Sequence, residues 1–308
     1  MGKLLELRQK IGAVENLQTI TRTLATVAAA KLSRTRRRAA GMRAYAQRIR
    51  EIVSHQQTAL ARSGLSLGAL SSLLREGQPI RRLALLVISA DRGMCGGYNL
   101  EACRLGLEFW ERSRKAGQQV SFVLKGSKGA KFFQRRHADV LHQEGWRRGA
   151  MRGDDVERLL SLLVNLYRSG KMDAVYAVYT EFHSPIHRRP RVVRILPVEL
   201  PGGTGEAAPE EADVHWSYEP GLAELIDELL AVYLRVQLAD VLLESYASEQ
   251  GARMITMEEA TERAEKSLQE YRVQHNRLRR ETITTDLLGM LFASRAIEGT
   301  GGTPARPA

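Results

Sequence analysis

The chain has 308 residues, of which 44% are hydrophobic and 26% charged, a composition that is typical of a globular protein and excludes a disordered one. Its 46 Lys and Arg against 35 Asp and Glu give a formal net charge of +11. This charge favours an acidic partner: nucleic acid, an anionic membrane face or an acidic protein surface. No window is apolar over the roughly eighteen residues that a membrane-spanning helix needs, and the chain opens on no signal sequence. We therefore expect a soluble protein that stays where it is made, with Cys95 and Cys103 as reduced thiols.

The first predicted element is a long helix within residues 1–60. Apolar side chains recur along it every three or four residues and would form one stripe. They are Leu4, Leu7, Ile11, Val14, Leu17, Ile20, Leu24 and Val27. Because a long amphipathic helix is not stable alone, we expect this stripe to pack against a second helix.

A basic run lies inside the same helix. It consists of Lys31, Arg34, Arg36, Arg37, Arg38 and Arg43. One interpretation is a solvated helix face, and the other is a contact with an acidic surface. Nucleic acid is the weaker candidate for that surface, because no aromatic residue lies within the run to stack on a base.

After a linker at 61–80, an α/β domain is predicted at 81–200. Strands and helices alternate along it, which indicates a mostly parallel sheet between helices, with its last strands antiparallel. The predicted strands are Arg82–Ala90, Val120–Lys125, Val140–Gln143, Ala174–Phe182 and Val192–Pro197. The predicted helices are Leu100–Lys115, Ser127–Arg136 and Asp154–Ser169, the last of them capped by Asp154. A flexible acidic loop at 201–218 ends this part of the chain.

The first strand of the domain ends in a glycine-rich turn, Asp91-Arg92-Gly93-Met94-Cys95-Gly96-Gly97-Tyr98-Asn99. A turn between strand and helix is where many α/β proteins bind a nucleotide, but these glycines do not have the spacing of the dinucleotide fingerprint. Neither Gly126-Ser127-Lys128 nor Gly170-Lys171 completes a phosphate-binding loop. We therefore expect no bound cofactor, and we expect Cys95 to be a small buried residue.

No catalytic residues and no metal site are predicted. His183 and His187, with Glu181, are the one set that suggests metal ligands. They stand beside Arg188, Arg189 and Arg191, and this cationic setting disfavours a bound cation. Ordinary loop histidines are the better interpretation.

The second long helix is predicted at 219–297, before a disordered tail at 298–308. Its apolar residues follow alternating intervals of three and four, with Thr261 and His275 filling two of the positions. They are Met254, Met257, Ala264, Leu268, Tyr271 and Leu278. A stripe this narrow is typical of a coiled-coil seam. The predicted fold is α/β, with the N- and C-terminal long helices forming an antiparallel coiled coil and a Rossmann-like α/β domain inserted between them.

Several stretches, taken together, resemble one family. They are Ile20-Thr21-Arg22 leading to Val27-Ala28-Ala29-Ala30-Lys31-Leu32; Ser89-Ala90 followed by the glycine-rich turn; Gly126-Ser127-Lys128-Gly129; Ala247-Ser248-Glu249-Gln250-Gly251-Ala252-Arg253-Met254; and Asn276 with Arg279, Ile283 and Thr284. In this order they are similar to the gamma subunit of F-type ATP synthase, from about Lys3 to Ile297. Thr23, Arg280 and Leu291-Phe292 depart from the family pattern, which points to a divergent bacterial branch.

The resemblance implies a non-catalytic subunit of an enzyme complex. The coiled coil would be the central-stalk shaft inside a ring of three alpha and three beta subunits. The α/β domain would be a collar that rests with epsilon on the ring of c subunits. Ion-driven rotation would then be coupled to ATP synthesis or hydrolysis, peripherally on the cytoplasmic face of the bacterial inner membrane.

The resemblance also implies site residues of two kinds. Contacts from the shaft to beta would be Arg22, Lys31, Arg34, Arg36, Arg37, Arg38, Arg253, Arg279 and Arg280. The collar turn would be formed by Asp91, Arg92, Gly93, Cys95, Gly96, Gly97 and Asn99. Two alternatives stay open: a basic coiled-coil adaptor that binds nucleic acid or anionic membrane, and a small-molecule enzyme built on the α/β domain.

Overall fold

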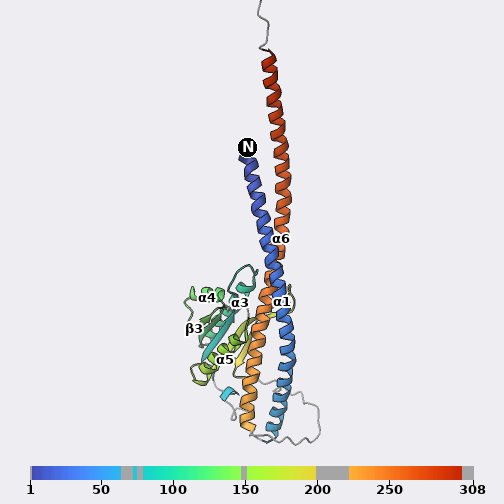
Figure 1. Ribbon diagram of the computed structural model, residues 1–308. Helices are drawn as coiled ribbons and strands as arrows, with labels where there is room; N and C mark the ends of the chain where they lie inside the picture. The colour runs from blue at the N-terminus through green and yellow to red at the C-terminus, as the bar shows by residue number, and fades with distance from the viewer. Residues whose placement is uncertain (1, 64–71, 75–78, 147–150, 199–221, 300–308) are drawn as a thin grey trace, which may run out of the picture. The chain divides into compact units, whose positions relative to one another are not determined.

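The computed structural model describes residues 2–63, 72–74, 79–146, 151–198 and 222–299 (Figure 1). Two helices are far longer than the others, α1 (Gly2–Ser63) and α6 (Leu222–Gly299). By the contacts among its residues the chain divides into two compact units, Thr26–Thr256 and Met1–Ala25 with Met257–Ala308, and both helices contribute to each unit. The predicted acidic loop, most of the predicted linker and most of the predicted tail lie outside the described residues.

The larger unit holds a five-stranded sheet in the order β3-β2-β1-β4-β5. The strands are β1 (Arg82–Ile88), β2 (Gln119–Lys125), β3 (Val140–Glu144), β4 (Ala174–Phe182) and β5 (Arg188–Leu196). The first four lie parallel, and β5 runs antiparallel to β4. The predicted mixed sheet is confirmed, but β5 begins at Arg188 instead of Val192, because a tight hairpin pairs Arg188 with Phe182.

Helices cover both faces of this sheet (Figure 1). They are α3 (Tyr98–Lys115), α4 (Ser127–Gln134) and α5 (Gly153–Arg168), with a short turn, η1 (Ser72–Leu74). One face packs against α3 and α4, the other against α5 and α6. Strand β1 lies between two neighbours and buries both faces, which explains its unbroken apolar sequence.

The start of α5 differs from the prediction. Asp154 is exposed, and the carboxylate of Asp155 accepts the backbone N–H of Arg152 at 3.0 Å instead. Asp155 also pairs at 3.0 Å with Lys125, whose side chain is fully buried. The residue that caps the helix must therefore face inward, because it also neutralises a buried lysine that requires an ionic partner.

The middle of α6 lies deep in the larger unit. Every residue from Val241 to Ala252 is buried, among them Leu242 and Tyr246 in the core against the sheet. The same core receives Met42 of α1. A helix that is buried on all sides has no amphipathic stripe, so the narrow seam seen in the sequence begins only beyond this stretch.

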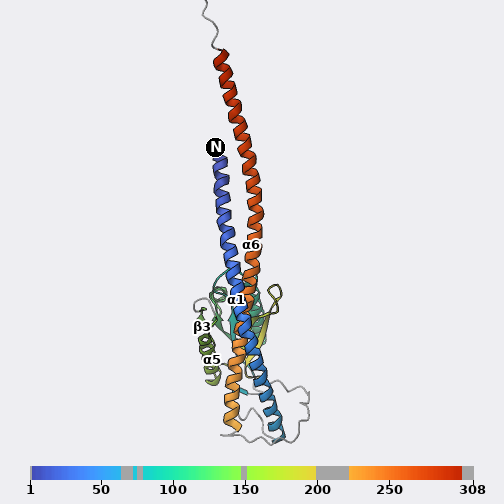
Figure 2. The same cartoon turned by 45° about the vertical axis from the view of Figure 1, so that its right-hand side comes forward.

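In the smaller unit α1 and α6 run side by side and antiparallel (Figures 1 and 2). The hydroxyls of Thr21 and Thr261 are 2.7 Å apart, and Arg272 Nη2 donates to Glu15 Oε1 at 2.7 Å. Residues earlier in α1 thus meet residues later in α6. On α6, Met257, Ala264 and Leu268 are buried, which confirms the alternating seam.

The predicted stripe on α1 is wrong in its second half. Leu17, Ile20 and Val27 are exposed, with Leu17 51% and Ile20 56% accessible. The buried positions continue the alternation of the first half instead, at Thr21, Ala25, Ala28, Leu32 and Thr35. From Ile11 to Ile20 the predicted stripe advances by three residues three times in succession. Each advance of three residues falls about 60° short of a full turn, so the predicted positions move around the helix and away from the seam.

Candidate functional site

The glycine-rich turn Asp91–Asn99 lies at the carboxyl end of β1, beside β4. This is the point where the strand order reverses, and where open α/β sheets bind their ligands. Asp91 fixes the start of the turn: its carboxylate accepts the N–H of Ser127 at 2.9 Å and that of Trp146 at 2.7 Å. The turn is therefore anchored to the segments that follow β2 and β3.

Buried contacts hold the rest of the turn. Asn99 Oδ1 accepts the N–H of Ala90 at 2.8 Å, and Asn99 Nδ2 donates to Cys95 Sγ at 3.1 Å. Cys95 is buried with Tyr98 and Ala252, and burial raises the pKa of its thiol. The prediction of a small buried Cys95 is confirmed. A protonated, enclosed thiol of this kind is a packing residue and a poor nucleophile.

Glycine is favoured at Gly96. Its φ of 54° is left-handed, and a Cβ there would lie 3.0 Å from Thr256 Oγ1 of α6. A side chain at this position would therefore require Thr256 to shift by a few tenths of an ångström and would also be strained in the left-handed backbone.

Polar side chains of α6 occupy the place that a ligand takes in other α/β sheets. Ser245 Oγ lies 2.8 Å from the hydroxyl of Tyr98 and 3.4 Å from the N–H of Thr180, at the end of β4. Ser248 donates to the Thr180 carbonyl at 2.9 Å, and Glu244 accepts the N–H of Phe182 at 2.7 Å. Sequence reasoning did not identify this cluster, although polar residues within the apolar helical segment that begins at Val241 were a usable signal.

Arg253 joins α6 to the turn. Its Nη1 pairs with Glu249 at 2.6 Å, and its Nη2 lies 3.5 Å from the carbonyls of Arg92 and Gly93. Burial raises the pKa of Glu249, and the charge of Arg253 opposes that shift. The contact of Arg253 with beta stays a prediction; within the chain it positions the turn.

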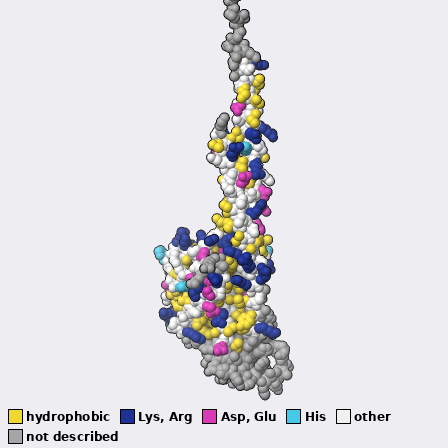
Figure 3. All heavy atoms as spheres, viewed as in Figure 1, with side chains coloured by type: hydrophobic (Ala, Val, Ile, Leu, Met, Phe, Trp, Pro, Cys, Tyr) yellow, Lys and Arg dark blue, Asp and Glu magenta, His cyan; other side chains and the backbone are white. Residues whose placement is uncertain are grey.

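The basic run lies on α1 in the larger unit. At 100° per residue, Lys31, Arg34 and Arg38 lie on one side of the buried seam, Arg36 on the other and Arg37 opposite it. Arg36 stands over the Phe182 ring at 5.9 Å. Arg34 and Arg37 are exposed and have no ion pair with any described residue. Figure 3 shows Lys and Arg side chains crowded on the face in view over this unit.

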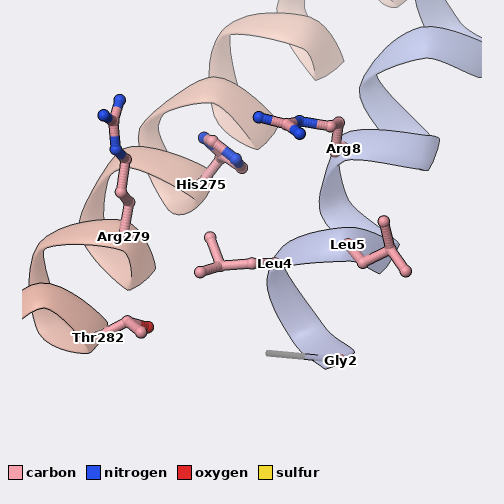
Figure 4. Close-up of a pocket in the computed structure, with 7 residues that line it drawn as sticks. All are labelled: Gly2, Leu4, Leu5, Arg8, His275, Arg279 and Thr282. Carbon is pink, nitrogen blue, oxygen red and sulfur yellow. The ribbon is translucent and has the colours of Figure 1, made fainter. Parts of the chain in front are cut away.

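The remaining predicted contacts, Arg22, Arg279 and Arg280, belong to the smaller unit and are exposed. Arg279 lines a groove of about 650 Å³ between the two helices. Leu4 and Arg8 point into it from α1, and Arg8 reaches toward His275, whereas Leu5 turns away (Figure 4). The structure therefore distributes the predicted basic contacts over two units and forms no single cluster from them.

The described residues contain neither a metal-binding cluster nor a membrane-spanning helix. No group of three His, Cys, Asp or Glu side chains is arranged to hold a metal ion. No described helix is apolar enough over a sufficient length to cross a membrane.

Comparison with known proteins gives the family. The ATP synthase family model matches residues 3–297. The ATP synthase gamma chain of Actinobacillus pleuropneumoniae serotype 5b (strain L20) is 32% identical, over 95% of this chain and 98% of that protein. The ATP synthase gamma chain of Desulforudis audaxviator (strain MP104C) is 33% identical, over 97% and 100%.

Solved structures share the fold. A chain of the Euglena gracilis mitochondrial ATP synthase in rotational state 3 gives a TM-score of 0.62 at 14% identity, over 100% of this chain and 98% of that one. A chain of the Tetrahymena thermophila mitochondrial ATP synthase central stalk and c-ring gives 0.55 at 20% identity, over 78% and 99%. With a family model and curated relatives that match almost all of it, the chain belongs to the ATP synthase family and, within it, to the gamma chains.

Proposed function

We propose that this chain is the central-stalk shaft of a rotary ATP synthase, which turns inside a ring of alpha and beta subunits. One observation in the smaller unit carries the proposal: its helix pair leaves large apolar side chains exposed. They are Leu17 and Ile20 on α1 and Ile283, Leu287, Leu288, Met290, Leu291 and Phe292 on α6, the last of them 68% accessible. Apolar surface of this extent marks an interface, and a ring that encloses the helices would bury it.

The shaft's contribution is mechanical. The two helices differ in sequence and in exposed side chains, so each beta subunit would meet a different surface of the shaft. Turning the shaft would then favour a different state of each catalytic site in turn, and rotation and ATP turnover would be coupled by these differential contacts. In this role the chain is non-catalytic.

The basic run would serve the same coupling. Lys31, Arg34, Arg37 and Arg38 present positive charge from one helical segment, and acidic loops of beta are the partners that match it. Arg22, Arg253, Arg279 and Arg280 remain further proposed contacts. The net charge of +11 is compatible both with acidic loops of beta and with a polyanion. Membership of the family disfavours a free-standing adaptor for nucleic acid or membrane.

The α/β domain would be the collar at the base of the shaft. There it would meet epsilon and the ring of c subunits, peripherally on the cytoplasmic face of a bacterial inner membrane. The curated relatives, which come from bacterial strains, support this location.

Charge reversal tests the proposal. In reconstituted complexes, Arg34→Glu, Arg37→Glu and Arg38→Glu together should lower the number of ions pumped per ATP hydrolysed. Each exposed pair contributes only about 0–1 kcal/mol, so the loss should grow with the number of substitutions and shrink with added salt.

The matched control reverses Arg104, Arg112 and Arg114 on α3, which are also exposed and change the net charge equally. Coupling should then stay at the wild-type value. Equal coupling in both triple variants at low salt would contradict a contact with beta and would indicate that the basic run is a solvated helix face.

A further inference from the structure

The amino ends of the four parallel strands form one edge of the sheet, and this edge is cationic. Exposed Lys and Arg side chains precede every one of these strands. They are Arg81 before β1, Lys115 before β2, Arg135 and Arg136 before β3, and Arg168 and Lys171 before β4. We call these six residues the amino-edge surface. None of them forms an ion pair with a residue that the structure describes.

The two carboxylates at this edge are bonded to other groups. Asp139 accepts a hydrogen bond from Ser121 Oγ at 2.5 Å. Asp173 accepts the backbone N–H groups of Arg81 and Arg82 at 3.0 Å and 2.7 Å, and it pairs with the Arg82 guanidinium at 3.1 Å. Neither carboxylate therefore forms an ion pair with the amino-edge surface.

Helix dipoles account for only part of this charge. A cation in the last turn of a helix offsets the partial negative charge there, and Lys115 and Arg168 are in such positions. Arg81 and Lys171, however, lie outside the described helices. Exposed cations that serve neither a helix end nor an internal ion pair indicate an anionic partner outside the chain.

The amino-edge surface has no apolar centre. In the described part of the chain the large exposed apolar side chains lie elsewhere, for example Leu17 and Ile283 on the long helices and Ile186 between β4 and β5. A protein partner usually binds around a buried apolar or aromatic anchor. A layer of anionic lipid headgroups attracts Lys and Arg without such an anchor. The composition of this surface thus favours a membrane over a protein.

Helix α6 leaves the larger unit at the opposite edge of the sheet, where Thr256 lies beside Gly96 at the carboxyl end of β1. We propose that the amino-edge surface faces the membrane and binds the headgroups of anionic phospholipids, across which it moves as the shaft turns. This lipid contact rests on the proposed function, in which the α/β domain is the collar at the base of the shaft. It is additional to the proposed contacts with epsilon and the c subunits.

Flotation of the full chain with vesicles tests the proposal. The wild type should bind vesicles of phosphatidylglycerol and phosphatidylcholine, bind phosphatidylcholine alone weakly, and lose binding with added salt. Four substitutions together should lower the partition coefficient by about fivefold for each cation removed. They are Lys115→Gln, Arg135→Gln, Arg168→Gln and Lys171→Gln. These side chains are exposed, so the midpoint temperature of unfolding should not change.

The matched control removes the same charge from α1 and should retain most of the binding. It consists of Arg34→Gln, Arg36→Gln, Arg37→Gln and Arg38→Gln. Equal losses in the two variants would overturn the proposal, because net charge alone would then bind the membrane.

A photo-reactive phenylalanine derivative in place of Arg135, beside the outermost strand β3, identifies the neighbour in the complete complex. In complexes reconstituted into the same anionic vesicles we expect it to cross-link to phospholipid. Cross-linking only to the c subunits or to epsilon would overturn the proposal. A chain that binds vesicles through this edge but does not assemble with alpha and beta would instead contradict the proposed function alone.

Discussion

Gly126 shows how narrowly single residues are constrained where β2 meets the turn region. Its φ is 100°, and a Cβ at this position would stand 2.1 Å from the carbonyl oxygen of Ser89. No side-chain rearrangement relieves a clash with backbone, so strand β1 itself would have to move. The sequence at Gly126 does not complete a phosphate-binding loop, and the structure gives this glycine a packing role.

Gly126→Ala should therefore lower the free energy of unfolding by about 3 kcal/mol or more. Gly117→Ala is the matched control, because Gly117 is also left-handed, at φ 77°, but has nothing within 4 Å of its Cβ position. It should cost only about 1–2 kcal/mol of backbone strain. Urea unfolding of both variants measures the difference, and equal losses would contradict the packing role.

Glu249 should make the free energy of unfolding depend on pH, and the direction of its pKa shift fixes the sign of that dependence. Burial raises the pKa of Glu249 above its ordinary 4.5, so the folded chain binds this proton more tightly than the unfolded chain. The stabilising contribution of protonation is complete below about pH 4.5 and is lost as the pH rises through the raised pKa. Relative to Glu249→Gln, the free energy of unfolding of the wild type should therefore fall as the pH rises above 4.5. Urea titrations at a series of pH values test this, and a difference that is flat or increases with pH would contradict it.

Among the elements, the seam between α1 and α6 differs from the sequence prediction in which residues of α1 are buried. Hydrophobicity alone favoured Leu17 and Ile20 as seam residues, yet Thr21 and Ala25 are buried in their place. Small and hydroxyl-bearing residues form this part of the seam because Thr21 bonds Thr261 across it. A polar pair inside a seam sets the register of the two helices.

The register predicts which cysteines pair. Thr21→Cys with Thr261→Cys should form a disulfide within one molecule on mild oxidation, since the two hydroxyl oxygens lie 2.7 Å apart. Leu17→Cys with Thr261→Cys is the control and should stay reduced, because Leu17 faces solvent. Cross-linking of the control pair in preference to the first would contradict this register and would place Leu17 in the seam, as hydrophobicity suggests.

Most elements of the larger unit were predictable from the sequence, because strand and helix periods are local properties. The parallel strands and the antiparallel last pair follow from apolar runs such as Leu83–Ile88. The long terminal helices follow from the absence of proline. The partners of buried polar residues were not predictable. Lys125 is the last residue of a predicted strand and Ser245 lies within the second predicted long helix. Only the tertiary fold brings them to Asp155 and to the end of β4.

For the whole molecule, the position of α6 reconciles a Rossmann-like strand order with a mechanical function. At the carboxyl end of β4, Ser245, Ser248 and Glu244 of α6 form hydrogen bonds with the backbone of Thr180 and Phe182. A helix in this place ties the α/β domain to the segment that continues into the coiled coil. Backbone groups at this end of the sheet, where open α/β sheets bind their ligands, are bonded here to a helix.

Rotation of the chain relative to beta can be observed directly with a probe on the α/β domain. A single cysteine at exposed Glu108 of α3 carries the probe, since Cys95 and Cys103 are buried and burial raises the pKa of both thiols, that of Cys103 to about 12. In complexes immobilised through beta, we expect stepwise rotation of the probe in one direction, which depends on ATP and stops when ATP is withdrawn. A probe that stays fixed relative to beta while the same complexes hydrolyse ATP would contradict the role of the chain as a rotating shaft.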